Sequence, residues 1–392
     1  MFIHQHRLRH LLRPQHYFDR NHYLSELKEL FRPSWQFAAT RSELKNDGDF
    51  ITIEIAGTPL ILRNFSGEVK AFINVCPHRH AMLTCAPSGN CEVLRCQYHG
   101  WEFNSEGRTG KIPEAKLFRP WDRENAHLSP IRISHCGDLL FVTLDDAAPS
   151  LREWMSPLYD EIKEAFFAPF WRMREVWDID TPCNWKVPTE NTLESYHVAT
   201  VHPTWTGGQL PAEQHSEHVL DDRYTTLRYK TSGPLDRRQC WVSRLLGGKP
   251  QSTYRHLHLH PNVAFCLTDT FNYIATCQPI SETTSVIRSR MYSIHGSRRG
   301  PLKDLVRHVA WRLGRKTMRM VFNEDRHIFP AQQSGLESSN CPGVIGAREE
   351  RIYQFQQYVC HKMNLTISED NGDLGEGRSE SIEAPMISVK SR

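Results

Sequence analysis

Two pairs of cysteine and histidine residues have the spacing of metal ligands. Cys76 and His78 form the first pair, Cys96 and His99 form the second, and seventeen residues separate the pairs. Thiolates and imidazoles in these numbers bind either a zinc ion or an iron–sulfur cluster. Structural zinc loops usually pair Cys with Cys and His with His. Each pair here holds one of each, which favours a [2Fe–2S] cluster in which one iron takes two sulfurs and the other takes two nitrogens.

Two further histidines, His197 and His202, are candidate ligands for a second metal ion. They are five residues apart, which separates two side chains by roughly 140° on an ideal helix. Both reach one metal only if the helix bends or ends near His202. Pro203 favours such an end, because it disfavours helical geometry in the residue before it. The spacing fits a 2-His-1-carboxylate triad, which holds Fe(II) and leaves positions open for O₂.

The carboxylate of such a triad has to come from a distant part of the chain. The best candidate is Asp325, in the run Phe322-Asn-Glu-Asp-Arg-His, and Glu324 is the alternative. A further acid, Glu194, stands three residues before His197 and hence on the same face of the expected helix.

These residues carry a family resemblance. The runs Cys76-Pro-His-Arg-His80 and Cys96-Gln-Tyr-His-Gly-Trp101 resemble the Rieske domain of Rieske non-haem iron oxygenases. The run from Glu324 to Gly335 is similar to the "Glu-Asp … Gln-x-Gly" helix of the same family. Two positions depart from the family pattern: His80 stands where Gly is common, and Gln97 where Pro is common. Neither is a ligand position, and the resemblance covers roughly residues 35 to 363.

The resemblance implies the catalytic alpha subunit of an oxygenase and assigns its cofactors. A Rieske [2Fe–2S] cluster and a mononuclear Fe(II) are expected, and their ligands are Cys76, His78, Cys96 and His99 for the cluster and His197, His202 and Asp325 for the iron. In the family, a reductase or ferredoxin passes electrons from NAD(P)H to the cluster. The electrons then cross to the iron of a neighbouring subunit in a head-to-tail homotrimer. A carboxylate bridges the two metal sites at that interface, and the matching position here is Glu194.

The same stretch narrows the expected reaction. Glu at position 194, within Glu-Asn-x-Leu-Glu-x-Tyr-His, resembles the choline, carnitine and glycine-betaine branch, which points to hydroxylation or oxidative dealkylation of a small alkylammonium substrate. Two alternatives stay open: cis-dihydroxylation of an aromatic ring, and a Rieske ferredoxin that carries electrons without oxygenase activity. A set of aromatic residues is either a cation–π box for the substrate or plain core: Trp177, Trp185, Trp205, Phe271 and Tyr273.

Composition excludes several other classes of protein. The 392 residues carry 48 basic and 45 acidic side chains, which argues against a nucleic-acid footprint. Mean hydropathy is −0.54, and no apolar run approaches the roughly 18 residues needed to span a bilayer. Of the eleven cysteines, the nine outside the two pairs are scattered without paired spacing, which indicates thiols in a reducing compartment, so we expect a cytoplasmic protein.

The hydrophobic pattern predicts an α+β protein: an N-terminal all-β Rieske domain, then a catalytic domain with a large antiparallel sheet flanked by helices. Alternating apolar residues from 50 to 73 predict short strands, and alternation recurs around 254–260, 272–278 and 285–293. Within this sheet, His256, His258 and His260 share one strand face; a metal site is possible, and a polar strand face is the preferred interpretation. The expected division is a helical arm (1–34), the Rieske domain (35–150), the catalytic domain (151–363) and a disordered tail (364–392).

Overall fold

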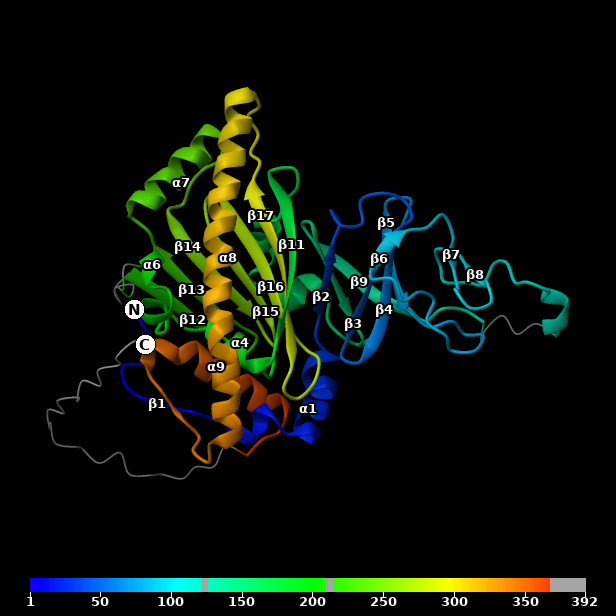
Figure 1. Cartoon of the computed structure of the whole chain (residues 1–392), viewed down its shortest axis with the longest axis horizontal. Coiled ribbons are helices and arrows are strands. Elements are labelled where there is room, and N and C mark those ends of the chain that lie inside the picture. Colours follow the sequence, from blue (N-terminus) through cyan, green and yellow to red (C-terminus); the bar gives the residue numbers. More distant parts are fainter. Residues whose placement is uncertain (121–125, 207, 209, 211–214, 367–392) are drawn as a thin grey trace, which may run out of the picture.

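The structure is a computed structural model, and it describes residues 1–120, 126–206, 208, 210 and 215–366. Two seven-stranded antiparallel sheets form its framework, and the long helices gather on the second sheet (Figure 1). The predicted α+β class, with an all-β domain first, is confirmed. Most of the expected tail lies outside the described residues.

The first sheet is built from short strands joined by tight turns. Its second and third strands in chain order pair through Ile55 and Thr58, and the two residues between them, Ala56 and Gly57, have φ of 47° and 74°. Two positive φ angles in a two-residue loop match the right-handed twist of a hairpin. In spatial order the strands are β2 (Gln36–Thr40), β10 (Leu139–Thr143), β9 (Pro130–Cys136), β5 (Glu68–Ile73), β4 (Thr58–Phe65), β3 (Asp49–Ile55) and β6 (Ser88–Asn90).

The second sheet carries the larger core. Its central strand Val263–Leu267 is buried along its whole length, as expected for a strand covered on both faces. In spatial order the strands are β11 (Trp171–Thr181), β17 (Ser285–Ile294), β16 (Phe271–Pro279), β15 (Val263–Leu267), β14 (Thr253–Leu259), β13 (Tyr224–Lys230) and β12 (Ser216–Leu220). Two short pairs complete the strands: β1 (Leu8–Arg9) with β18 (Val344–Ile345), and β7 (Leu94–Arg95) with β8 (Glu102–Phe103).

One helix dominates the rest of the chain. Helix α8 (Pro301–Ser338) is 38 residues long and runs along the second sheet (Figure 1). None of the helices in the described ranges is both long and apolar enough to cross a bilayer. The other α-helices are α1 (Arg20–Glu26), α2 (Leu151–Met155), α3 (Tyr159–Ala165), α4 (Lys186–Thr192), α5 (Val198–Val201), α6 (Pro203–Thr206), α7 (Pro234–Leu245) and α9 (Glu350–Lys362). Short turns of other helix types span Pro14–Tyr17, Leu27–Phe31, Ala115–Phe118 and Ala347–Glu349.

The N-terminal arm packs into the core of the catalytic half. Tyr17 and Phe31 belong to the same buried cluster as Trp185. The fully buried Glu26 carboxylate forms an ion pair with the ammonium of Lys186, the first residue of α4, and accepts a hydrogen bond from the Trp185 indole at 2.8 Å. Residues 1–34 therefore pack against the start of α4. The division of the chain into four segments stays a prediction.

The two sheets are joined by buried polar contacts. Arg290 on β17 donates from Nε to the Glu43 carboxylate at 3.0 Å. Two positions further along β17, the Tyr292 hydroxyl donates to Asp138 Oδ2 at 2.7 Å. Glu43 follows β2 and Asp138 directly precedes β10, so both lie in loops of the first sheet. One strand of the second sheet is therefore held by two carboxylates from the first domain.

Candidate cluster site and active site

Two loops of the first domain bring the Cys/His pairs together. In the first loop the backbone N–H of His80 donates to the carbonyl of Cys76, and in the second the backbone N–H of Gly100 donates to the carbonyl of Cys96. Each donor stands four residues after its cysteine, and both distances are 3.0 Å. His80 has φ of 58° and Gly100 has φ of 71°. The left-handed conformation explains why glycine suits this position, and His80 adopts it despite its side chain.

The four side chains have the surroundings of cluster ligands. Both cysteines are buried, and the His78 and His99 ring centroids are 4.6 Å apart. Burial raises the pKa of the Cys76 thiol to about 11, so without a metal this buried thiol stays protonated. His78 Nδ1 is buried and has no hydrogen-bond partner among the described residues. A buried imidazole nitrogen without a partner is costly unless it binds a ligand, so these residues fit a [2Fe–2S] cluster.

The second pair of histidines lies in a broken helix. Helix α5 ends at Val201, His202 leaves helical geometry with φ −116° and ψ 48°, and Pro203 begins α6. The predicted end at His202 is therefore present. Glu194, however, does not lie on a helix with His197: it occupies the turn after α4 and accepts from the backbone N–H groups of Tyr196 and His197. It meets His197 because these two hydrogen bonds fold the turn before α5 around its carboxylate.

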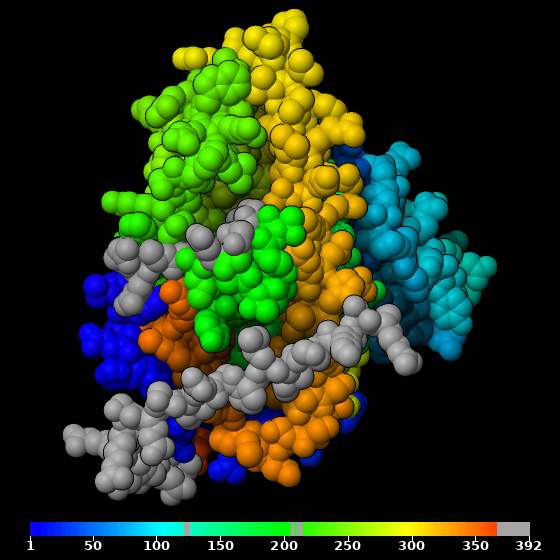
Figure 2. Space-filling view, turned by 60° about the vertical axis from the view of Figure 1, so that its left-hand side comes forward, coloured from blue at the N-terminus to red at the C-terminus, as the bar shows by residue number. Residues whose placement is uncertain are grey.

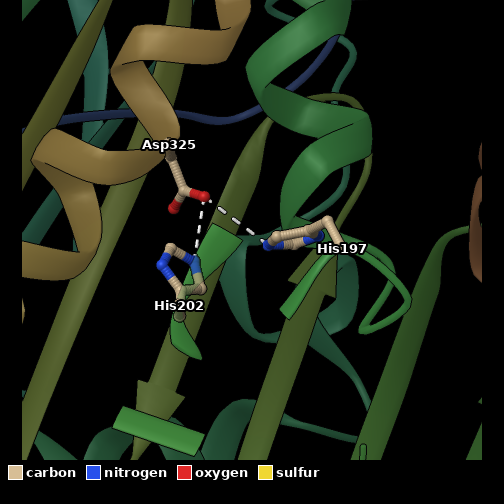
Figure 3. A group of neighbouring side chains, drawn as sticks. All are labelled: His197, His202 and Asp325. Atoms are coloured by element: carbon tan, nitrogen blue, oxygen red, sulfur yellow. Dashed lines mark ion pairs between the residues drawn. The ribbon is translucent and has the colours of Figure 1, made fainter. Parts of the chain in front are cut away.

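Three candidate iron ligands converge at this break. One ligand atom from each of His197, His202 and Asp325 lies within 4.8 Å of the others. Asp325 Oδ1 lies 3.0 Å from His202 Nε2 and 3.5 Å from His197 Nε2 (Figure 3). Asp325 comes from α8, more than a hundred residues along the chain. Two imidazoles and one carboxylate on one side of a point form the donor set of a facial triad.

Two further carboxylates lie behind the histidines. Glu324 Oε2 is 2.7 Å from His202 Nδ1, and Glu194 Oε1 forms an ion pair with His197 Nδ1. Each acid therefore contacts the nitrogen that faces away from Asp325, and Glu324 is not placed as a third ligand. Burial alone would lower the pKa of His202, but the carboxylates of Asp325 and Glu324 raise it above its usual value. Such partners fix the tautomer of a ligand histidine and raise its basicity.

A cavity opens beside Asp325. The empty space there, open solvent included, is about 460 Å³. Among the lining residues that the structure describes, Asp325 is the one acidic side chain. Burial lowers the pKa of His258 well below its usual value, so that imidazole is neutral. The lining residues are Pro188, Thr189, Asn191, Thr192, His258, Asn262, Ala264, Tyr273, Ala275, Cys277, Ile287, Phe322, Asp325 and Phe329.

The aromatic residues singled out from the sequence do not form one box. Tyr273 lines the cavity, Trp185 belongs to the core beneath the N-terminal arm, and Phe271 stacks on Trp311. Trp177 packs edge-on against Phe322, and the side chain of Trp205 lies outside the described part. The aromatic wall contains Phe322 and Phe329 instead. Both were missed, although they stand three residues before and four residues after Asp325, on the same face of α8.

The histidine row, His256 and His258 on β14 with His260 directly after it, is buried rather than solvated. His256 Nδ1 pairs with Arg351 of α9 at 2.9 Å, and the Nδ1 atoms of His258 and His260 are 3.1 Å apart. Burial lowers the pKa of His260 to about 3. The three histidines form a polar strand face, which was the interpretation preferred from the sequence, and α9 covers this face.

Comparison with known proteins agrees with both sites. The family model "Ring hydroxylating alpha subunit (catalytic domain)" matches residues 170–365, and "Rieske [2Fe-2S] domain" matches residues 34–122. The chain is 31% identical over 217 residues to the carnitine monooxygenase oxygenase subunit of Escherichia coli K12, covering 53% of this chain and 54% of that protein. It is 29% identical over 250 residues to the glycine betaine monooxygenase oxygenase subunit of Chromohalobacter salexigens, covering 62% and 55%. The matches thus span about half the length of these curated relatives.

Solved structures share the fold. The quaternary ammonium Rieske monooxygenase CntA in complex with L-carnitine superposes with a TM-score of 0.70 at 20% identity, covering 89% of this chain and 95% of that one. Naphthalene 1,2-dioxygenase from Rhodococcus sp. bound to indole gives 0.72 at 17% identity, covering 92% and 95%. The expected cofactors, a Rieske [2Fe–2S] cluster and a mononuclear iron, follow from the two family matches. The chain belongs to the family of ring-hydroxylating alpha subunits, with a Rieske domain ahead of the catalytic domain.

Proposed function

We propose that the chain is the terminal component of an oxygenase that hydroxylates or oxidatively dealkylates a small organic substrate. One observation carries this proposal: His197, His202 and Asp325 converge beside a cavity in a chain that also has a Rieske site. Iron bound at such a triad activates O₂ when electrons reach it one at a time. NAD(P)H would supply them through a reductase or ferredoxin.

The residues of the chain prepare the site in three ways. Each histidine turns Nε2 toward Asp325 while Glu194 or Glu324 holds the proton at Nδ1. The aromatic wall of Tyr273, Phe322 and Phe329 keeps water from the bound substrate. The break at His202 aims both imidazoles at one point, which a continuous helix could not do.

The cavity also limits the class of substrate. Its described lining contains aromatic faces suited to an alkylammonium cation, but neither Lys nor Arg, the side chains that bind a carboxylate most strongly. Carnitine and glycine betaine carry a carboxylate, whereas choline, named for a relative in Beta vulgaris that is 31% identical over 186 residues, does not. We therefore propose an alkylammonium substrate without an anionic group.

A second candidate is cis-dihydroxylation of an aromatic ring. The apolar wall favours it, and the chain is 30% identical over 226 residues to the anthranilate 1,2-dioxygenase large subunit of Acinetobacter baylyi. A pure electron carrier is the remaining alternative, and it would hold about two irons per chain instead of about three.

The test is substrate-dependent O₂ consumption by the purified, iron-loaded protein with a chemical or enzymatic reductant. Choline, carnitine, glycine betaine and an aromatic acid are compared, and ¹⁸O₂ counts the oxygen atoms that enter the product. We expect turnover with choline-type compounds and one labelled atom. Two labelled atoms in a ring diol would establish the alternative, and two irons without turnover would leave an electron carrier.

The electron donor and the assembly belong to the same proposal. Basic side chains around the cluster loops would attract an acidic donor: Arg79, Arg108, Lys111, Lys116 and Arg119. Arg95 contributes less, because it pairs with Glu102 at 2.8 Å. A head-to-tail homotrimer would let Glu194 contact the cluster of a neighbour, and a cytoplasmic location suits the eleven unpaired cysteines.

A further inference from the structure

Helices α7 and α8 form one end of the catalytic domain. They pack against each other, and the first turns of the N-terminal half of α8 extend beyond the sheets (Figure 1). In Figure 2, α7 in light green and this half of α8 in yellow together make the upper end of the molecule. We call residues 234–249 and 298–319 the basic ridge.

The basic ridge concentrates positive charge. Its two segments hold twelve Lys and Arg residues against two Asp residues, whereas the whole chain carries a net charge of only +3. Some of this charge is neutralised: Glu175 pairs with Arg315 and Arg319, and Asp304 pairs with Arg307. The remaining exposed basic residues include Arg237, Arg238, Arg244, Arg298, Arg312 and Lys316.

The basic ridge also exposes large apolar side chains. Leu302, Leu305, Val309 and Leu313 of α8 are 68%, 59%, 47% and 61% exposed, and their spacing of three and four residues places them in one stripe. On α7, Trp241 is 58% exposed. Contiguous exposed apolar residues mark interaction surfaces, and this stripe runs beside Arg312 and Lys316.

We propose that the basic ridge binds the surface of an anionic lipid bilayer. Helices that lie in a membrane interface combine Lys and Arg with Leu and Trp, and basic residues near a negative leaflet add attraction. The same surface of a second copy would be repelled by like charge. An electron donor is a poorer occupant, because the cluster loops near β7 and β8 lie at the opposite side of the molecule (Figure 1).

Sedimentation of the full, metal-loaded chain with lipid vesicles tests the proposal. We expect the protein to pellet with vesicles of 70% phosphatidylcholine and 30% phosphatidylserine but not with pure phosphatidylcholine, and to be released at high salt. Equal partition onto both kinds of vesicle, or onto neither, would overturn the proposal.

Two double variants separate the contributions of charge and apolar contact. Arg312→Glu with Lys316→Glu, and Leu305→Glu with Leu313→Glu, should each weaken partition onto the anionic vesicles about tenfold or more. Arg41→Glu with Lys45→Glu is the matched control, since both residues are exposed on the Rieske domain, and it should bind like the wild type. None of these residues contacts a metal site, so turnover of a water-soluble substrate should be kept.

Other occupants give different results. If the stripe is covered by a second copy, the leucine variants change the mass of the protein in solution while vesicle binding is absent. If it receives an acidic protein, such as the reductase, the ridge variants weaken that complex and the wild type ignores phosphatidylserine. Either result would refute lipid binding.

Discussion

Two groups of histidines in the catalytic domain differ in what surrounds them. His197 and His202 lie among three carboxylates, and the pKa of His202 is raised. The row on β14 lies beside Arg351 and, among the described residues, hydrogen-bonds with no acid; burial lowers the pKa of His260 to about 3. Histidine spacing alone therefore does not distinguish the proposed metal site from a buried strand face. The acids that the fold brings to the imidazoles do.

Asp325→Ala is expected to have the largest effect. It removes the carboxylate of the proposed iron triad, so the iron content should fall from about three to about two per chain, and turnover should vanish. Iron analysis and O₂ consumption measure this. The visible spectrum of the cluster is the internal control and should persist. Full iron and activity in this variant would transfer the ligand role to another acid.

Glu194→Ala should come next. It removes the partner of His197 Nδ1 without removing a ligand, so both metals should stay largely bound while product formation falls about 10- to 100-fold or more. Stopped-flow spectroscopy should show a cluster that is reduced normally and then stays reduced when substrate and O₂ arrive. Glu217→Ala, an exposed acid on β12, serves as the control. Normal turnover would exclude Glu194 as a link between the metal sites.

Glu324→Gln should have a smaller effect. An amide oxygen can still accept from His202 Nδ1, but without charge, so Fe(II) should bind about tenfold more weakly. Titration of the metal-free protein with Fe(II) gives the affinity. A complete loss of iron, equal to that of Asp325→Ala, would contradict the placement of Glu324 behind the histidine.

His260→Gln should have the smallest effect and one confined to acid. Below pH 6.5 the unfolded chain protonates this residue, whereas the folded chain does not until about pH 3. Stability therefore falls with decreasing pH in this window by about 1.4 kcal/mol per pH unit from this residue. The variant should lose less urea resistance than the wild type between pH 7 and pH 5. The control is His361→Gln, at an exposed position of α9, which should lose urea resistance as the wild type does. If His260→Gln also behaves like the wild type, the His260 imidazole is protonated in the folded protein and the prediction is wrong.

The sequence predicted features that neighbouring residues form better than features that distant segments of the chain form together. The two cluster loops are each a few residues long, so spacing revealed the ligand pairs, and Pro203 revealed the helix end at His202. The placement of Glu194 in a turn was not predicted, because a spacing of three residues fits a helix and a turn equally well. Phe322 and Phe329 were missed because they have the pattern of ordinary helix residues until Asp325 is seen to line the cavity. The burial of the β14 histidines depends on α9, which is almost a hundred residues away.

The junction between the two sheets has a consequence for assembly. Glu43 and Asp138 hold Arg290 and Tyr292 of β17 through buried contacts, so the Rieske domain has little freedom to turn relative to its own catalytic domain. In the proposed head-to-tail trimer, each cluster serves the iron of another chain. In a mixed trimer of altered and unaltered chains, a substitution that loosens this junction would then misalign a site in a neighbouring subunit, while the altered chain's own iron, fed by an unaltered neighbour, would still receive electrons.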